Sequence, residues 1–387
     1  MKNMRLVITI CFIAFVVGIS AAGLLQKDRE FSPNENRYLA EAPEFSWEDV
    51  LDGRFQEKLE EYLRDQIWGR DQWITVKTAV QKAAGNTDIG GAYVGKDGYD
   101  FEKIVPEDVD DSQVQRNIVA VQDYFDVAAG TISKDRLSFL LVPTSGLVME
   151  DKLPKNARLF DQSAYIEQVQ NAMQDYNFVD VREELCAQSD AYIYYRTDHH
   201  WTTEGAYIAY EKWCETTGMT AASKESLEQN VVAEDFRGSL YSKILNVDSA
   251  YDSIWIYTPA GESMDAVNAC KVTVDEKESG VIYDVTKLAE KDKYAFFFGG
   301  NYGQVHIEGS PQQETGRNLL VVKDSFANSF VPLILNQYDN IYMVDLRYYN
   351  GDMESYLSEH DITDVLVLYN ISNFISDKNL YKLNGGM

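Results

Sequence analysis

Residues 318–329 have the sequence NLLVVKDSFANS, and this stretch decides the fold class. The apolar run from Leu319 to Val322 is typical of a short, fully buried strand. Asp324 and Ser325 follow the strand directly, and the segment from Phe326 to Leu335 is expected to be a helix. Because strands and helices that alternate in this way build parallel sheets, the stretch predicts an α/β fold.

The same alternation continues over most of the chain from residue 112 onwards. Helices are predicted at 111–128, 160–174 and 202–213, and strands at 137–142, 178–181, 294–298, 341–346 and 365–369. We therefore expect residues 111–387 to form a three-layer α/β/α domain with a mainly parallel sheet. A charged, irregular region at about 217–293 is expected to be an insertion with strands of its own.

The N-terminus carries the clearest local signal. Lys2 and Arg5 precede an uncharged run from Leu6 to Leu25, which is long enough to span a bilayer as a helix. Positive charge before the run places the N-terminus in the cytoplasm and the body outside. Residues 20–22, Ser-Ala-Ala, also suit a signal peptidase, so both an uncleaved anchor (1–27) and a cleaved signal stay open. Both interpretations export the body.

Residues 28–110 are expected to form a separate lead-in to the main domain. A polar, proline-bearing tether at 28–50 precedes an amphipathic helix, and short strands are expected between Gly85 and Phe101.

The charge of the chain excludes one class of partner. It has 62 acidic and 35 basic residues, a formal net charge of −27. Nucleic-acid binding depends on basic side chains that neutralise phosphates, so we expect no nucleic-acid partner.

Two of the four histidines are adjacent, in the segment YRTDHHWTTEG at 195–205. Imidazole and carboxylate are zinc ligands, so Asp198, His199 and His200 form one candidate metal site. The spacing differs from that of a His-Glu-x-x-His helix, however, and this favours a catalytic base with its orienting carboxylate. Capping of the following helix is a third interpretation. We expect neither a bound metal nor a cofactor.

Ser325 is the candidate nucleophile. It follows a buried strand at the point where the next helix is expected to begin, close to backbone N–H groups. Sites in parallel sheets lie beyond the carboxyl ends of the strands, and Asp198 also follows a strand-like segment, 191–195. The two segments are therefore predicted to meet at one edge of the sheet. An ordinary helix cap is the alternative role for Ser325.

Together these segments resemble the DHHW family of exported bacterial proteins. The similar blocks are Asp198-His199-His200-Trp201, residues 323–329, residues 345–349, and Asn36-Arg37 with Asp65 to Arg70. The family is similar in turn to the periplasmic alginate O-acetylation proteins, which have an SGNH-hydrolase-like fold. The resemblance implies Ser325 as the nucleophile, His200 as the base and Asp198 as the residue that orients the base.

Two further residues are candidates for binding the substrate. Asn301 follows two glycines and is expected to donate to an oxyanion, as an Asn side chain often does in SGNH-like sites, although a Gly-Asn turn is an equal alternative. Arg347 resembles an arginine of the acetyltransferase relatives and would hold a substrate oxygen or pair with an acidic neighbour. Lys323 stands where a Gly-Asp-Ser block has its glycine, a departure that the resemblance to the DHHW family leads us to expect.

The resemblance implies an extracytoplasmic O-acetyltransferase that modifies a cell-surface or secreted polysaccharide through an acyl group on Ser325. A membrane-bound O-acyltransferase partner would supply the acetyl group, and the N-terminal helix would hold the protein on the membrane. Two alternatives stay open. One is a secreted carbohydrate esterase with the same triad, and the other is a non-catalytic, membrane-tethered scaffold.

Overall fold

The computed structural model describes residues 2–34, 37–276, 278–309 and 314–385. The chain divides into two compact units. One comprises residues 1–90 with 242–247, and the other comprises residues 91–241 with 248–387.

The larger unit is built on an eight-stranded sheet with the order β11-β10-β12-β14-β13-β15-β6-β7. The strands from β14 to β7 in this order pair in parallel, whereas β12, β10 and β11 extend the sheet antiparallel beyond β14. Their bounds are β6 (Leu137–Val142), β7 (Asn177–Asp180), β10 (Val272–Val274), β11 (Glu278–Gly280), β12 (Gln304–Glu308), β13 (Asn318–Lys323), β14 (Asn340–Val344) and β15 (Asp364–Asn370). The predicted mainly parallel sheet is confirmed.

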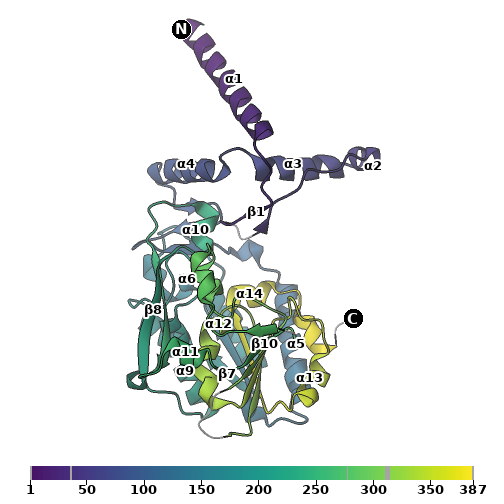
Figure 1. The fold of residues 1–387 in the computed structure, drawn as a ribbon, viewed down its shortest axis with the longest axis vertical. Helices are drawn as coiled ribbons and strands as arrows, with labels where there is room; N and C mark the ends of the chain where they lie inside the picture. The colour runs from purple at the N-terminus through teal and green to yellow at the C-terminus, as the bar shows by residue number, and fades with distance from the viewer. Residues whose placement is uncertain (1, 35–36, 277, 310–313, 386–387) are drawn as a thin grey trace. The chain divides into compact units, whose positions relative to one another are not determined.

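Helices cover both faces of this sheet because neighbouring side chains of each central strand point to opposite sides. Leu320 and Val322 pack under α5 (Asp111–Ala128), α13 (Met353–Glu359) and α14 (Ile371–Ser376), where α7 (Gln162–Ala172) also lies. Leu319 and Val321 pack with α9 (Thr203–Thr217) and α12 (Ala327–Phe330) on the other face. Figure 1 shows α9 and α5 on opposite sides of the strands, so the three-layer α/β/α architecture is confirmed.

The remaining elements of the larger unit are short. They include β4 (Ala92–Val94), β5 (Asp100–Glu102), α6 (Ser145–Val148), α8 (Arg182–Ala187) and α11 (Met264–Val267). The region expected as an insertion contributes an antiparallel pair, β8 (Leu227–Phe236) with β9 (Asp252–Pro259), and it also supplies β10 and β11 to the main sheet.

Three predictions of local structure were wrong. Residues 294–298 form no strand, because Lys293–Phe296 is a 3₁₀ helix. Residues 191–195 have only an isolated bridge from Tyr194 to Trp201. The helix predicted at 326–335 is a single α-turn, α12, followed by a 3₁₀ helix at Val331–Gln337. Short apolar runs look alike in sequence whether tertiary packing makes them strands or buried turns.

The smaller unit contains the N-terminal helix α1 (Lys2–Leu25), followed by α2 (Trp47–Leu51), α3 (Arg54–Gln66) and α4 (Arg70–Ala83). Within α1, residues Met4–Gly23 are long and apolar enough to cross a membrane, and none of this stretch is buried. Short strands β1 (Phe31–Ser32) and β2 (Arg37–Tyr38) pair, while β3 (Asp88–Ile89) lies near the end of the unit. Of the N-terminal block similar to the DHHW family, Asn36 lies outside the described residues, and Arg37 forms two hydrogen bonds with the buried carboxylate of Asp65, at 2.7 and 2.6 Å.

Candidate active site

A buried carboxylate fixes the conformation of the loop that carries Asp198 and His200. Asp252, at the start of β9, accepts the backbone N–H groups of Arg196 and Thr197, both at 2.8 Å, and the Thr197 hydroxyl at 2.6 Å. Asp252 is fully buried, so these bonds are shielded from water. The loop leads directly into α9. Asp252 of β9 and the first turn of α9 together fix its conformation.

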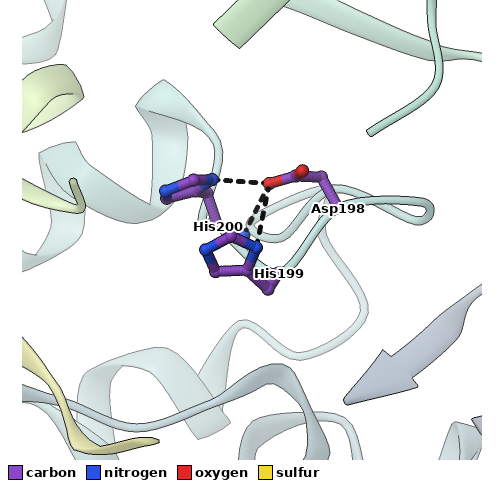
Figure 2. A group of neighbouring side chains, drawn as sticks. All are labelled: Asp198, His199 and His200. Carbon is purple, nitrogen blue, oxygen red and sulfur yellow. Dashed lines mark hydrogen bonds and ion pairs between the residues drawn. The ribbon is translucent and has the colours of Figure 1, made fainter. Parts of the chain in front are cut away.

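Asp198, His200 and Ser325 form a continuous hydrogen-bonded chain. Asp198 Oδ1 lies 2.5 Å from His200 Nδ1, and His200 Nε2 lies 2.6 Å from the Ser325 hydroxyl oxygen. All three residues are buried. Figure 2 shows the Asp198 carboxylate facing the rings of both His199 and His200. The structure thus brings together the three residues that the sequence predicted to meet, in an order that suits proton transfer from the serine.

The electrostatics of the pair suit a neutral base beside an ionised carboxylate. Burial, together with the neighbouring His199, lowers the pKa of His200 to about 4, although the Asp198 carboxylate raises it. Burial opposes the ionisation of Asp198, but both imidazoles and the backbone N–H of Ser239 outweigh it and hold its pKa well below the usual value. At neutral pH, His200 is therefore uncharged and able to accept a proton.

A second backbone contact completes the environment of Asp198. Its Oδ2 accepts the backbone N–H of Ser239 at 2.7 Å. Gly238 precedes Ser239 in the chain, and a Cβ atom at position 238 would lie 2.2 Å from Oδ2 of Asp198. Only glycine therefore allows the 238–239 segment to approach the carboxylate so closely. Neither residue was a candidate from the sequence, because they lie about forty positions away in an irregular region.

The turn that presents Ser325 is held by residues on both sides of it. Asp324 is buried, and its carboxylate accepts the backbone N–H groups of Phe326 at 2.9 Å and of Asn370, at the end of β15, at 2.8 Å. Trp201 donates its indole N–H to the Phe326 carbonyl at 3.0 Å. The tryptophan next to His200 thus ties the segment of the base to the turn of the nucleophile.

Tyr294 covers the imidazole of the candidate base. The two rings stack at 3.8 Å between centroids and 10° between planes, and the Tyr294 hydroxyl donates to the Ser325 carbonyl at 3.1 Å. The sequence placed this residue in a strand and gave it no role. Its 3₁₀ conformation turns the ring onto His200, and no sequence pattern signals such a contact.

Asn301 and Arg347 lie in a second polar cluster, which Lys323 joins together. The Lys323 ammonium donates to the side-chain oxygens of Asn301 at 3.0 Å and Asn328 at 2.9 Å, and it lies 3.8 Å from Asp345. Arg347 forms two hydrogen bonds with the same Asp345, at 2.9 and 2.6 Å, so it has the acidic neighbour that was the alternative to a substrate contact. Burial lowers the pKa of Lys323 to about 8, although Asp345 raises it.

The amide of Asn301 has a defined orientation in this cluster. Its oxygen accepts from both Lys323 and Asn328, the second at 3.2 Å. Its Nδ2 group makes no hydrogen bond with any residue in the described ranges and is free to donate. The sequence singled out Lys323 only as a replacement for glycine, and it could not reveal that a buried ammonium sets the orientation of this amide.

Ligand atoms of Asp198, His199 and His200 lie within 4.8 Å of one another, so the group meets the distance requirement for a metal ion. Both ring nitrogens of His200 already have partners, and His199 Nδ1 lies 2.7 Å from the Ser239 hydroxyl. An ion held by all three residues would have to displace at least one of these hydrogen bonds. The arrangement fits a hydrogen-bonded base better than a set of ligands.

Comparison with known proteins agrees with this architecture. A family model described as DHHW protein matches residues 82–344, whereas no curated protein matches the chain. A DHHW family protein from Eubacterium siraeum has a TM-score of 0.63 and 22% identity, over 77% of this chain and 96% of its own. Bacillus cereus PatB1, solved with a sulfonyl adduct, has a TM-score of 0.60 and 22% identity, over 74% and 96%.

The O-acetyltransferase domain of Pseudomonas putida AlgJ is more distant, with a TM-score of 0.48 and 12% identity, over 74% of this chain and 93% of its own. The family model spans well over half of the length of this chain. On these grounds the protein belongs to the DHHW family.

Proposed function

We propose that this protein is an extracytoplasmic O-acetyltransferase that carries an acetyl group on Ser325 and passes it to a hydroxyl group of a polysaccharide. The observation that supports this best is the unbroken path from Asp198 through His200 to Ser325, with contacts of 2.5 and 2.6 Å. Membership of the DHHW family and the acetyltransferase named among the structural neighbours agree with this chemistry.

The reaction would proceed in two half-reactions. His200 Nε2 takes the hydroxyl proton of Ser325 while the Ser325 oxygen attacks the carbonyl carbon of the acetyl donor. The proton then passes to the leaving group of the donor. In the second half-reaction, His200 takes the proton of a sugar hydroxyl group, and the sugar oxygen attacks the acetyl group on Ser325. The proton returns to the Ser325 oxygen as the ester bond breaks. Asp198 stabilises the transient imidazolium in both halves.

An oxyanion forms in each half-reaction and needs a donor. We assign this role to Asn301 Nδ2, because Lys323 and Asn328 hold the amide oxygen and leave the nitrogen free. Arg347 is proposed to contact an oxygen of the substrate while it stays paired with Asp345. Preorganised donors of this kind each contribute about a hundredfold or more to the rate in other enzymes.

Intact-protein mass spectrometry with an aryl acetate tests the proposal. Wild-type protein and a Ser376→Ala control should gain one acetyl group, whereas Ser325→Ala should gain none. A wild-type protein that gains no acetyl group would favour the non-catalytic scaffold. Addition of a neutral oligosaccharide then separates transfer from hydrolysis, because transfer yields an acetylated sugar. Free acetate as the sole product would favour the esterase.

We further propose that α1 anchors the protein, that the body faces outward, and that a membrane-bound O-acyltransferase partner supplies the acetyl group. The uncharged run from Leu6 to Leu25, with Lys2 and Arg5 before it, supports this placement. Protease added to intact spheroplasts should degrade the body, and full protection would contradict the outward orientation. Purification of the protein in mild detergent should recover a multi-span acyltransferase if the partner is correct.

A further inference from the structure

Helix α4 has one face that packs inside the smaller unit. Thr78 is buried, and its hydroxyl donates to the Ile244 carbonyl at 2.5 Å. One turn later, the Lys82 ammonium donates to Asn246 at 2.7 Å. Both partners belong to the segment 242–247, which is part of the same compact unit. These contacts fix which side of α4 faces inward.

The opposite face of α4 is apolar and exposed. With a rotation of about 100° per residue, Trp73, Val76 and Val80 lie together on the side away from Thr78 and Lys82. Their exposed fractions are 37%, 52% and 63%.

Trp68 extends this row at its N-terminal end. It is 49% exposed, and its carbonyl accepts the indole N–H of Trp73 at 3.0 Å. We call Trp68, Trp73, Val76 and Val80 the apolar stripe. Exposed apolar side chains gathered on one face of a helix make that face a candidate interaction surface.

Contacts between α4 and α1 indicate what covers the stripe. The Trp73 ring meets Phe15 of α1 edge-to-face, with 5.6 Å between ring centroids. Phe15 lies inside the stretch Met4–Gly23, which is apolar enough to cross a membrane. Just beyond this stretch, the Gln26 side chain donates to the Gln66 carbonyl at the end of α3, and Arg29 N donates to the Gln66 side chain at 3.0 Å. The α3–α4 junction therefore lies where the apolar stretch ends.

We propose that the apolar stripe rests in the outer leaflet of the phospholipid bilayer that α1 crosses. This inference rests on the membrane anchor of the proposed function. An amphipathic helix can bury its apolar side among the acyl chains while its polar side stays at the headgroups. Lys77 lies between Trp73 and Val80 on the helix, where its long stem can reach the headgroups.

Lipid is the occupant that the contacts favour over a protein partner. A side chain that touches Phe15 of a membrane-spanning α1 is already at the depth of lipid. The net charge of −27 disfavours broad contact of the body with anionic lipid, so the proposed lipid contact is confined to the uncharged stripe. The stripe would thus fix the smaller unit on the membrane, close to a membrane-embedded acetyl donor.

Tryptophan quenching by brominated phosphatidylcholine in proteoliposomes of the full chain tests the proposal. Bromine on the acyl chains should quench wild-type tryptophan emission. The double variant Trp68→Phe and Trp73→Phe should lose most of this quenching, whereas Trp255→Phe should keep it. Equal quenching in the double variant and the wild type would overturn the assignment.

A protease-protected α1 fragment and acetylation of Ser325, measured on the same proteoliposomes, separate the two proposals. If α1 is protected and Ser325 is acetylated but the stripe is not quenched, the stripe proposal fails while the proposed function stands. If quenching is absent in lipid and the stripe becomes shielded only when a second membrane protein is added, lipid is the wrong occupant. Loss of Ser325 acetylation with quenching intact would instead contradict the proposed function alone.

Discussion

Replacement of Asp198 by asparagine tests the proposed triad with the least change in shape. The carboxylate has three hydrogen-bond contacts: Oδ1 with Nδ1 of His200 at 2.5 Å and with the His200 backbone N–H at 3.0 Å, and Oδ2 with Ser239 N at 2.7 Å. Asparagine can keep the contacts of one oxygen, but it removes the negative charge. It can also turn an N–H group towards His200, which then favours the wrong tautomer.

The expected loss follows from this geometry. With charge centres about 4 Å apart and an effective dielectric constant of about 20, a carboxylate and an imidazolium attract by about 4 kcal/mol. This attraction exists only when His200 is protonated, as it is in the transition state. Each 1.36 kcal/mol corresponds to about a tenfold change in rate, so Asp198→Asn should be about 1,000-fold slower. The wrong tautomer can raise the loss to about 10,000-fold.

The rate of acetyl-enzyme formation with an aryl acetate is the assay, at a temperature where both proteins are folded. Asp235→Asn is a matched control, because Asp235 is an exposed carboxylate that pairs with Lys293 at 3.0 Å, outside the hydrogen-bonded chain. It should keep the wild-type rate. If Asp198→Asn also stays within about fivefold of wild type, less than 1 kcal/mol is lost. The charge of Asp198 would then have no role in catalysis.

Three further predictions concern the same site. Because burial lowers the pKa of His200 to about 4, the rate should be flat near neutral pH and fall only as pH drops towards about 4; a pH–rate profile with half-maximal activity near the ordinary histidine value of about 6.5 would contradict this. Lys323→Met should lower kcat by about a hundredfold with little change in KM, because the Asn301 amide loses its fixed orientation; steady-state kinetics that match wild type would exclude this positioning role. His199→Ala should slow acetylation less than His200→Ala does and should leave metal content unchanged by elemental analysis; a larger effect at His199 would mean that the family motif was aligned one residue out of register.

Much of the fold could be predicted because its signals are local. The buried strands at 319–322 and 365–369 are continuous apolar runs, and the helix that begins at Thr203 follows a threonine cap. The uncharged segment of α1 is equally plain. Residues 294–298 gave the same apolar signal as the true strands and were misassigned, since local hydrophobicity does not say which neighbour the backbone will pair with.

The sequence by itself determined the α/β class, the apolar N-terminal helix and the residue types at both halves of the candidate site. Only the tertiary structure decided that His200 and Ser325, which are 125 positions apart, meet at 2.6 Å. The same holds for the stacking of Tyr294 on His200 and for the buried ammonium of Lys323 beside Asn301. The physical reason is that burial, pKa and hydrogen-bond partners are properties of a packed environment. That environment is assembled from segments far apart in the chain, so no local pattern encodes it.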